Sequence, residues 1–167
     1  MGNYMKDCLK QVFKLTNPSK YFGTKNPICK SSWEYQVFNF MDKHPDVTRW
    51  GYECLEVPYF NPLKGGYTIY YPDIYCHTRQ ANGSVKQFLI EIKPNKMCSP
   101  PVQPAIPKTK TPNSLKKYEK ALRRYTIDKG SYEVNKSKWE QALAWCNRHG
   151  ITFLLVTEKE VPTFTIR

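Results

Sequence analysis

The stretch from residue 70 to residue 94 constrains the fold of this chain more than any other. It contains two runs rich in β-branched and aromatic residues, Tyr-Tyr-Pro-Asp-Ile-Tyr at 70–75 and Gln-Phe-Leu-Ile-Glu-Ile-Lys-Pro at 87–94, with a polar turn between them. Such runs predict two neighbouring β-strands. Residues two apart in a strand share a face, so Glu91 and Lys93 point to one side and the apolar residues that alternate with them point to the other.

The loop between the two runs determines which side chains can meet. Asn82-Gly83 is a strong signal for a β-hairpin. A strict two-residue loop at this dipeptide would pair Asp73 with Ile92 and place Asp73 on the opposite face from Glu91. An odd-length loop or a β-bulge would instead place Asp73 opposite Glu91 or Lys93. The three charged side chains can therefore converge only if the loop has odd length or the ladder contains a bulge.

Asp73, Glu91 and Lys93 together have the chemistry that metal-dependent phosphodiester hydrolysis needs. Two carboxylates can hold Mg²⁺, and the ion polarises a phosphate and lowers the pKa of a bound water. The lysine ammonium can orient this water or offset the developing negative charge. The alternative is a solvent-facing hairpin on which Glu91 and Lys93 form an ordinary surface pair.

Residues 31–44 predict a helix that precedes these strands. Ser31 is a good N-cap, an apolar stripe follows at helical spacing, and His44-Pro45 ends the pattern. Glu34 has two interpretations. It completes a capping box with Ser31, and it also lies on the flank of the buried stripe, where a carboxylate could reach a metal.

The remaining elements complete a recognisable order. Residues 50–58 predict a further strand, and residues 135–149 predict a helix that ends at Gly150. The apolar run 151–157 predicts a buried parallel strand. Residues 94–112 hold six of the thirteen prolines and predict an extended excursion, followed by a basic amphipathic helix from about residue 113 to 125.

The net charge of +12 is concentrated in two segments. Residues 1–30 carry +5, residues 108–138 carry +7, and the rest of the chain is neutral. This asymmetry predicts a polyanion partner, although solvated lysines are the alternative. Lys136 and Lys138 fall in the first turn of the predicted second helix, where they oppose the helix dipole. The candidate DNA-binding residues are Lys108, Lys110, Lys116, Lys117, Lys120, Arg123, Arg124, Lys136 and Lys138.

The length indicates one domain, and the order of the predicted helices and strands indicates the α/β class. The expected organisation is a basic N-terminal arm at 1–30 and a domain at 31–167, which includes a Pro-rich, basic insertion at 94–134. Six cysteines are scattered without a Cys-x-x-Cys pair, which favours reduced thiols. No run of about 18 apolar residues is present, so no membrane contact is expected.

The order helix, strand, strand with Asp73, strand with Glu91-x-Lys93, helix, strand resembles the αβββαβ core of the restriction-endonuclease-like superfamily. Pro72-Asp73 and Glu91-x-Lys93 resemble its Pro-Asp…(Asp/Glu)-x-Lys signature. The resemblance implies a mixed central sheet flanked by helices. More narrowly, the chain is similar to the head completion nucleases of tailed, myovirus-type bacteriophages, and the same core resembles the TnsA-type endonuclease subunit of certain transposons. The segments that carry the narrower resemblance are Lys-Leu-Thr-Asn-Pro (14–18), Ser-Ser-Trp-Glu (31–34), Trp-Gly-Tyr-Glu-Cys (50–54), Pro-Tyr-Phe-Asn-Pro-Leu (58–63), Tyr-Pro-Asp-Ile (71–74), Ile-Glu-Ile-Lys-Pro (90–94) and Thr-Glu-Lys (157–159).

The resemblance implies a Mg²⁺-dependent DNA nuclease, with Mn²⁺ able to substitute, that has both endo- and exonuclease action. Its expected partners are double-stranded DNA and phage portal or neck proteins, in the host cytoplasm during virion assembly and then in the virion neck. Asp73, Glu91 and the backbone carbonyl of Ile92 are the expected metal ligands, Glu34 supports the metal, and Lys93 positions the attacking water. We expect low sequence specificity. Two alternatives stay open, a structural DNA-binding protein of the virion neck and a transposase or recombination endonuclease subunit of the same fold.

Overall fold

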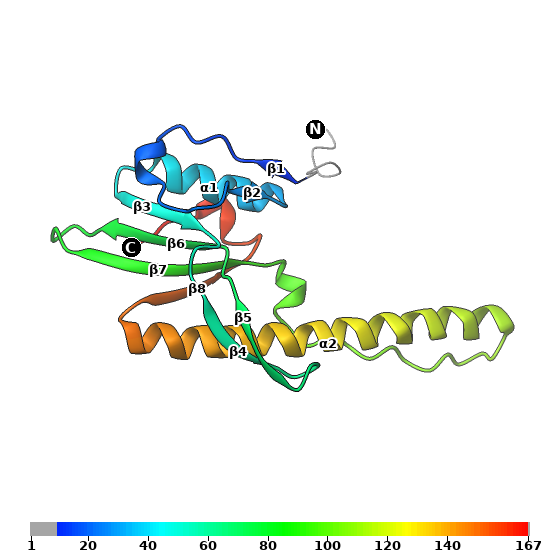
Figure 1. Cartoon of the computed structure of the whole chain (residues 1–167). Helices are drawn as coiled ribbons and strands as arrows, with labels where there is room; N and C mark the ends of the chain where they lie inside the picture. The colour runs from blue at the N-terminus through cyan, green and yellow to red at the C-terminus, as the bar shows by residue number, and fades with distance from the viewer. Residues whose placement is uncertain (1–9, 167) are drawn as a thin grey trace, which may run out of the picture.

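A four-stranded sheet forms the centre of the protein (Figure 1). The structure is a computed structural model that describes residues 10–166. The strand order of the sheet is β3-β6-β7-β8, with β3 (Val47–Tyr52), β6 (Ile74–Arg79), β7 (Val85–Ile92) and β8 (Thr152–Val156). The first three strands pair antiparallel and β8 pairs parallel to β7. The predicted mixed sheet is therefore confirmed, and so is the predicted parallel strand after Gly150, although four of its five residues are only partly buried.

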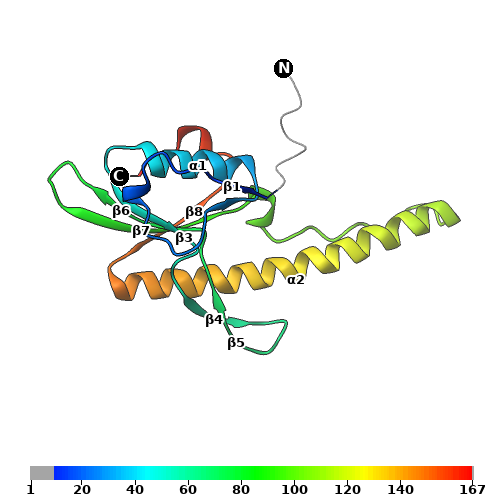
Figure 2. The ribbon, with the colours of Figure 1, turned by 45° about the horizontal axis from the view of Figure 1, so that its top comes forward.

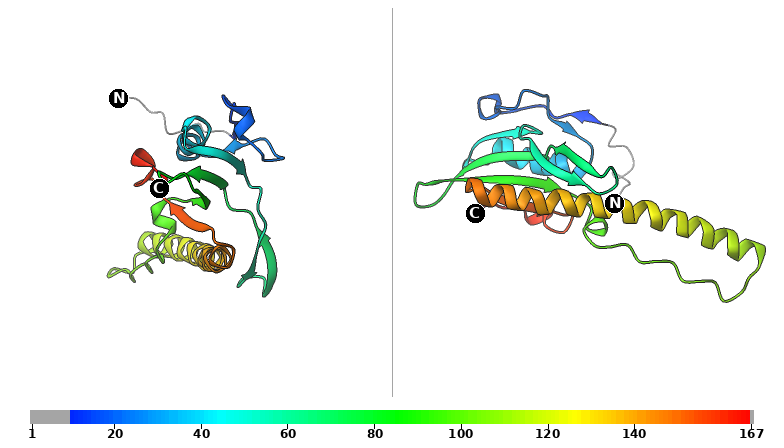
Figure 3. Two further views of the ribbon diagram at one scale, coloured as in Figure 1. Left: turned by 90° about the vertical axis from the view of Figure 1, so that its left-hand side faces the viewer. Right: turned by 60° about the horizontal axis from the view of Figure 1, so that its bottom comes forward.

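Helices cover both faces of this sheet, α1 on one side and α2 on the other (Figure 3, left). The alternation along β7 explains the arrangement, because Phe88 and Ile90 lie in the core under α1 while Leu89 lies in the core under α2. A strand buried on both faces reads as a nearly continuous apolar run, as β7 does from Phe88 to Ile90.

Helix α1 (Ser32–Lys43) begins and ends where the sequence predicts. The Ser31 hydroxyl accepts a hydrogen bond from the Glu34 N–H at 3.1 Å, and the Glu34 carboxylate accepts one from the Ser31 N–H at 3.1 Å. This reciprocal pair is the predicted capping box. His44 forms the C-cap in an extended conformation, as the following proline requires.

The β6–β7 hairpin has the odd loop that brings the charged residues together. The register pairs Ile74 with Ile90 and Arg79 with Val85. The Gln80 N–H donates to the Ser84 carbonyl at 2.8 Å, which leaves a three-residue loop closed by Gly83 at φ +81°. A three-residue loop with a left-handed glycine is a common hairpin connection. Continued by one residue, this register places Asp73 opposite Glu91.

The predicted strand at 50–58 is wrong, because the chain leaves the sheet within it. Strand β3 ends at Tyr52, and Glu53 has a left-handed φ of 42° while its N–H donates to the Asp73 carbonyl at 3.1 Å. Strands β4 (Val57–Asn61) and β5 (Gly66–Tyr70) then form a separate two-stranded sheet. Val57 and Tyr59, which share one face of β4, are buried in the apolar cluster that also contains Ala142 and Cys146 of α2. The hairpin is therefore held against α2 by apolar packing.

The two helices predicted at 113–125 and 135–149 are one helix, α2 (Pro112–His149), 38 residues long. No proline interrupts it after its first residue, and an internal glycine such as Gly130 costs only about 1 kcal/mol relative to alanine. Gly150 caps its end at φ +67°, as predicted. Lys136 and Lys138 therefore lie well inside the helix, and the prediction that they oppose its dipole is wrong.

The described part of the predicted N-terminal arm belongs to the same core. It consists of β1 (Gln11–Val12), η1 (Pro18–Lys20) and β2 (Ile28–Cys29), and Phe13 is buried under α1. Among residues 10–166, the boundary expected after residue 30 does not separate two cores. The part of the arm at 1–9 lies outside the described residues.

Two short 3-10 turns, η2 (Asn95–Met97) and η3 (Val161–Thr163), complete the structure. No disulfide joins the five cysteines in the described part of the chain. Within residues 10–166, none of the helices combines the length and the apolar character that crossing a membrane requires.

Asp42 ties the N-terminal segment to α1 and provides a test of this packing. Its fully buried carboxylate accepts hydrogen bonds from the Thr16 N–H at 2.8 Å and the Asn17 N–H at 3.1 Å. Asp42→Ala leaves both donors without a partner, so we expect the free energy of unfolding in urea to fall by about 1–3 kcal/mol. The exposed Asp46 is the matched control, with an expected change within about 0.5 kcal/mol for Asp46→Ala. Equal stability of the two variants would contradict this account.

Candidate active site

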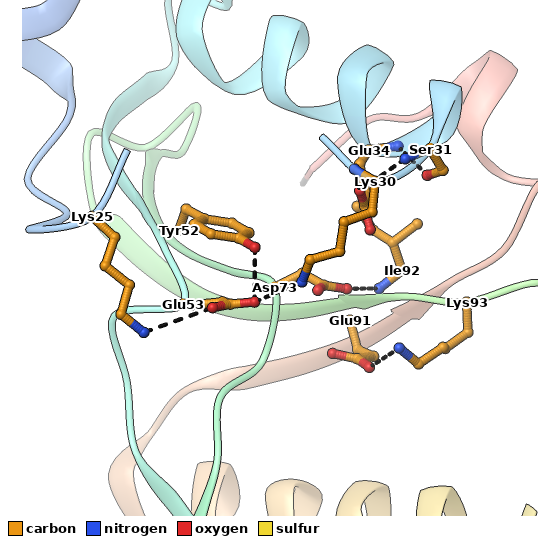
Figure 4. A network of polar contacts seen from close by, with 10 residues as sticks. All are labelled: Lys25, Lys30, Ser31, Glu34, Tyr52, Glu53, Asp73, Glu91, Ile92 and Lys93. Atoms are coloured by element: carbon orange, nitrogen blue, oxygen red, sulfur yellow. Dashed lines mark hydrogen bonds and ion pairs between the residues drawn. The ribbon is translucent and has the colours of Figure 1, made fainter. Parts of the chain in front are cut away.

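The candidate site lies where β7 ends, between the two helices (Figure 4). Glu91 is the next-to-last residue of β7, Lys93 follows the strand, and Asp73 immediately precedes β6. Glu34 comes from the first turn of α1. The structure thus brings Asp73, Glu91 and Lys93 together, as the spacing predicted, with Glu34 beside them.

Asp73 and Glu91 form a deeply buried pair of carboxylates, 7% and 2% exposed. The Ile92 N–H donates to Asp73 Oδ2 at 2.8 Å and fixes the orientation of this carboxylate. Lys93 Nζ lies 2.8 Å from Glu91 Oε1, and its side chain is 27% exposed. Lys93 is therefore the member of the group that reaches toward solvent.

One buried oxygen of this pair has no partner. Glu91 Oε2 makes no hydrogen bond although it is buried. Burial raises the pKa of Tyr70 and the Glu91 carboxylate raises it further, which places the Tyr70 hydroxyl close to Glu91. A buried carboxylate oxygen without a donor carries a large desolvation cost. Two neighbouring carboxylates with a free oxygen suit a hard divalent cation, which prefers oxygen ligands. The residues present therefore fit a metal at this position.

Burial controls the charge state of the group. Burial raises the pKa of Asp73 above its usual range, and the neighbouring Glu91 carboxylate raises it further, against the opposing effect of Lys93. Burial alone would lower the pKa of Lys93, but the attraction of Glu91 and Asp73 outweighs it and raises this pKa. Lys93 therefore carries its charge at neutral pH.

Glu34 serves the helix cap and lies within electrostatic reach of the pair. Its Oε2 accepts the Ser31 N–H and also the Lys30 N–H, so both of these bonds fall on one oxygen. Burial raises the pKa of Glu34, and the charge of Lys93 is among the influences that lower it. In the described chain, no three His, Cys, Asp or Glu side chains are grouped closely enough to hold a metal by themselves. The capping role is confirmed, and a metal role for Glu34 stays a prediction.

Lys138 joins the site from the α2 side. Its Nζ lies 5.3 Å from the ring centre of Tyr70 and 5.5 Å from that of Tyr59. Burial lowers the pKa of this lysine, and the charge of Glu91 opposes the shift. The sequence singled out Lys138 as a surface phosphate contact, whereas the structure places it half buried beside the carboxylates.

A second polar network at the edge of the site is one that sequence reasoning missed (Figure 4). Glu53 Oε1 accepts hydrogen bonds from Lys30 Nζ at 2.9 Å and from the Tyr52 hydroxyl at 2.8 Å, and Lys25 Nζ lies 3.7 Å from Glu53 Oε2. The Lys30 hydrogen bond helps to hold the pKa of Glu53 below its usual value, although burial opposes it. Lys25 and Lys30 lie more than twenty residues before Glu53, so no local sequence pattern predicts their part in this network.

The other candidate DNA-binding residues lie away from the carboxylates. Lys108 and Lys110 are exposed on the extended segment before α2. Lys136 lies 3.9 Å from Glu140 on the outer surface of α2. The remaining candidates occupy the exposed N-terminal half of α2, and they are Lys116, Lys117, Lys120, Arg123 and Arg124.

A mixed sheet with a buried Asp–Glu pair and a lysine at the end of its central hairpin is an arrangement suited to phosphodiester hydrolysis. The family model of the TnsA-like endonuclease N-terminal domain matches residues 44–158. The chain therefore belongs to the TnsA-like endonuclease family, which agrees with a restriction-endonuclease-like core.

A particular relative extends the likeness over most of the chain. The chain is 34% identical over 143 residues to the head completion nuclease of Enterobacteria phage T4, covering 85% of this chain and 86% of that protein. The likeness to head completion nucleases is thus confirmed. No solved structure matches the chain significantly.

The stability of the metal-free protein as a function of pH tests the burial of Asp73. Folding raises the pKa of this carboxyl above 3.8, so the folded state retains a proton that the unfolded state releases. The folded protein therefore loses stability as the pH rises from about 4 through the raised pKa. Asp73→Asn keeps an acceptor for the Ile92 N–H. Because asparagine does not ionise, this variant should not lose stability as the pH rises.

We expect Asp73→Asn to be more stable than the parent protein at about pH 8 and closer to it at about pH 5, in urea titrations with EDTA present. Glu140→Gln, on the exposed surface of α2, is the control and should show no such trend. A variant that is less stable than the parent at about pH 8 would contradict the assignment.

Proposed function

We propose that this nuclease hydrolyses phosphodiester bonds of double-stranded DNA with a divalent metal, Mg²⁺ by preference and Mn²⁺ as a substitute. The single observation that carries the proposal is the buried pair Asp73 and Glu91, which has a partnerless oxygen and a charged lysine beside it. Burying such a pair is unfavourable unless a cation compensates its charge. A divalent cation at this position could also polarise a phosphate and activate a water for phosphodiester hydrolysis.

The carboxylates of Asp73 and Glu91 would hold the metal, together with the backbone carbonyl of Ile92. A bound divalent cation supplies a Lewis acid for the phosphate and makes a water more acidic. The Ile92 N–H keeps Asp73 Oδ2 in place, so Asp73 can present its other oxygen. Glu34 would support the metal through its Oε1, since its Oε2 serves the helix cap.

Two lysines provide the positive charge that the reaction requires. Lys93 holds Glu91 Oε1 at 2.8 Å and reaches solvent, so its ammonium can orient the attacking water for in-line attack on phosphorus. Lys138 approaches from the opposite side on α2 and can offset negative charge on the phosphate oxygens. Charge stabilisation and positioning thus account for most of the expected rate enhancement.

We infer low sequence specificity and both endo- and exonuclease action. The candidate contacts outside the carboxylates are lysines and arginines on exposed surfaces, and such residues suit phosphates more than base edges. The protein would therefore cut duplex DNA of unrelated sequences at similar rates.

The relative that covers most of the chain is named a head completion nuclease, and this supports a role in phage head completion. We propose that the protein acts in the host cytoplasm during virion assembly, joins heads to tails beside portal or neck proteins, and stays in the virion neck. The family model supports a second candidate, a subunit that cuts defined ends during recombination. A preference for branched or end-marked DNA over plain duplex would favour that second candidate.

Substitution of the three central residues tests the proposed chemistry. Asp73→Ala, Glu91→Ala and Lys93→Ala should each reduce Mg²⁺-dependent cleavage of linear and circular DNA by at least about 100-fold, because each removes a separate contribution to charge stabilisation. Calorimetric titration with Mg²⁺ separates their roles, since the two carboxylate variants should lose binding and Lys93→Ala should retain it. Glu140→Ala is the control with full activity. Near-parental turnover in a folded variant would remove that residue from the mechanism.

The variant Glu34→Gln distinguishes a role of Glu34 in capping α1 from a role in supporting a metal. Glutamine can also complete a capping box, so the thermal stability should be nearly unchanged. If the charge supports a metal, the Mg²⁺ concentration that gives half-maximal activity should rise several-fold, and saturating Mg²⁺ should restore most of the rate. An unchanged Mg²⁺ titration would show that Glu34 is structural only.

A further inference from the structure

The N-terminal half of α2 projects well beyond the rest of the protein (Figures 1 and 2). At 1.5 Å per residue the whole helix is about 57 Å long. Its buried residues are Asn135, Ala142 and Cys146, all in the C-terminal half. The first half, residues 112–130, is therefore held away from the core, and we refer to it as the arm.

An extended proline-rich segment, residues 98–111, runs alongside the arm (Figure 3, right). Prolines 101, 104 and 107 are half buried whereas the residues between them are exposed. This three-residue period is that of a polyproline II helix. Tyr118, Leu122 and Tyr125 form a half-buried stripe on α2 at helical spacing. Pro101 lines a cavity together with Arg124 and Asp128 of α2, so the segment lies against the helix near the base of the arm.

The opposite side of the arm is open and basic. Lys116, Lys120 and Arg123 lie there, about half a helical turn away from Tyr118, and all three are exposed. Within the described residues no ion pair involves any of them, in contrast to Arg124, whose Nε is 2.9 Å from Asp128 Oδ2. We refer to these three residues as the arm face.

The arm face lies in line with the active site. Lys120 is 18 residues before Lys138, which corresponds to about five full turns at 3.6 residues per turn. The two side chains therefore leave α2 in nearly the same direction. Lys138 Nζ lies 5.3 Å from the ring centre of Tyr70, and the charge of Glu91 acts on it. The arm face therefore points to the side of α2 on which the active site lies.

We propose that the arm face is a binding surface for the backbone of duplex DNA, and that it holds the duplex about one helical turn from the bond being cut. This inference rests on the proposed nuclease function. Lys120 is about 27 Å and Lys116 about 33 Å from Lys138 along the helix axis. One turn of B-DNA rises about 34–36 Å, so a strand whose phosphate lies at Lys138 returns to the same side near Lys116.

Three observations favour duplex DNA over an acidic protein as the occupant. The arm face consists of cations without partners, which suits a regular row of phosphates. Its spacing from Lys138 matches the duplex repeat. It also continues directly from the active site, where DNA must lie. The exposed Ile127 lies between the arm face and Lys138 along the helix, where it lines the same cavity as Pro101.

Salt-dependent binding tests the proposal. We compare the triple variant Lys116→Gln, Lys120→Gln, Arg123→Gln with a control of equal charge loss, Lys43→Gln, Lys129→Gln, Lys159→Gln. The control alters exposed lysines that lie off the arm face and are not candidate DNA contacts. Affinity for a duplex of about 30 bp, roughly three turns, is measured across a salt series with EDTA present. Three lost phosphate contacts should flatten the slope of log affinity against log salt by about 2.7.

The outcomes separate this proposal from the proposed function. A flatter slope in the arm-face variant alone supports the proposal. Equal changes of slope in both triple variants would show that the effect comes from net charge alone, and this would overturn the proposal. An unchanged slope in the arm-face variant would also overturn it and would assign the surface to another partner, such as a protein. Mg²⁺-dependent cleavage by the parent protein is measured in parallel, because its absence would contradict the nuclease function whatever the arm binds.

Discussion

The structure depends on the burial of two carboxylates side by side at the end of β7. Asp73 and Glu91 repel each other in a region from which water is excluded, and such a pair is unfavourable unless cations and donors compensate. The compensation comes from the Ile92 N–H on Asp73 and the Lys93 ammonium on Glu91, and one oxygen of Glu91 still lacks a partner. An arrangement that reduces stability in this way is expected where function requires it.

The surrounding elements place these groups with little freedom. The three-residue loop of the β6–β7 hairpin sets the register that brings Asp73 opposite Glu91, and a loop one residue shorter would turn Asp73 to the other face. Helix α1 begins at the site because its capping box involves Glu34. Helix α2 covers the sheet with its C-terminal half, brings Lys138 to the carboxylates and carries the arm outward, so one element connects the site with the surface proposed to hold DNA.

Short-range patterns predicted much of this arrangement. The spacing of Glu91 and Lys93, the capping box at Ser31 and the apolar run of β8 depend on neighbouring residues, and all three were predicted correctly. The sequence could not show that Glu53 turns the chain out of the sheet, because the cause is a hydrogen bond to Asp73 twenty residues later. It also predicted two helices, at about 113–125 and 135–149, where α2 is continuous. The same error placed Lys138 in the first turn of a helix, whereas it lies well inside α2 and is half buried.

The central claim is that Asp73 and Glu91 are a metal site, and anomalous X-ray diffraction from crystals grown with Mn²⁺ tests it most directly. The account predicts an anomalous peak between the two carboxylates at a metal–oxygen distance near 2.0–2.2 Å, as expected for a small hard cation. It also predicts that the peak lies within reach of the Ile92 carbonyl and close to Glu91 Oε2. Well-ordered carboxylates with no peak between them at saturating Mn²⁺, or a peak only at another position, would contradict the account.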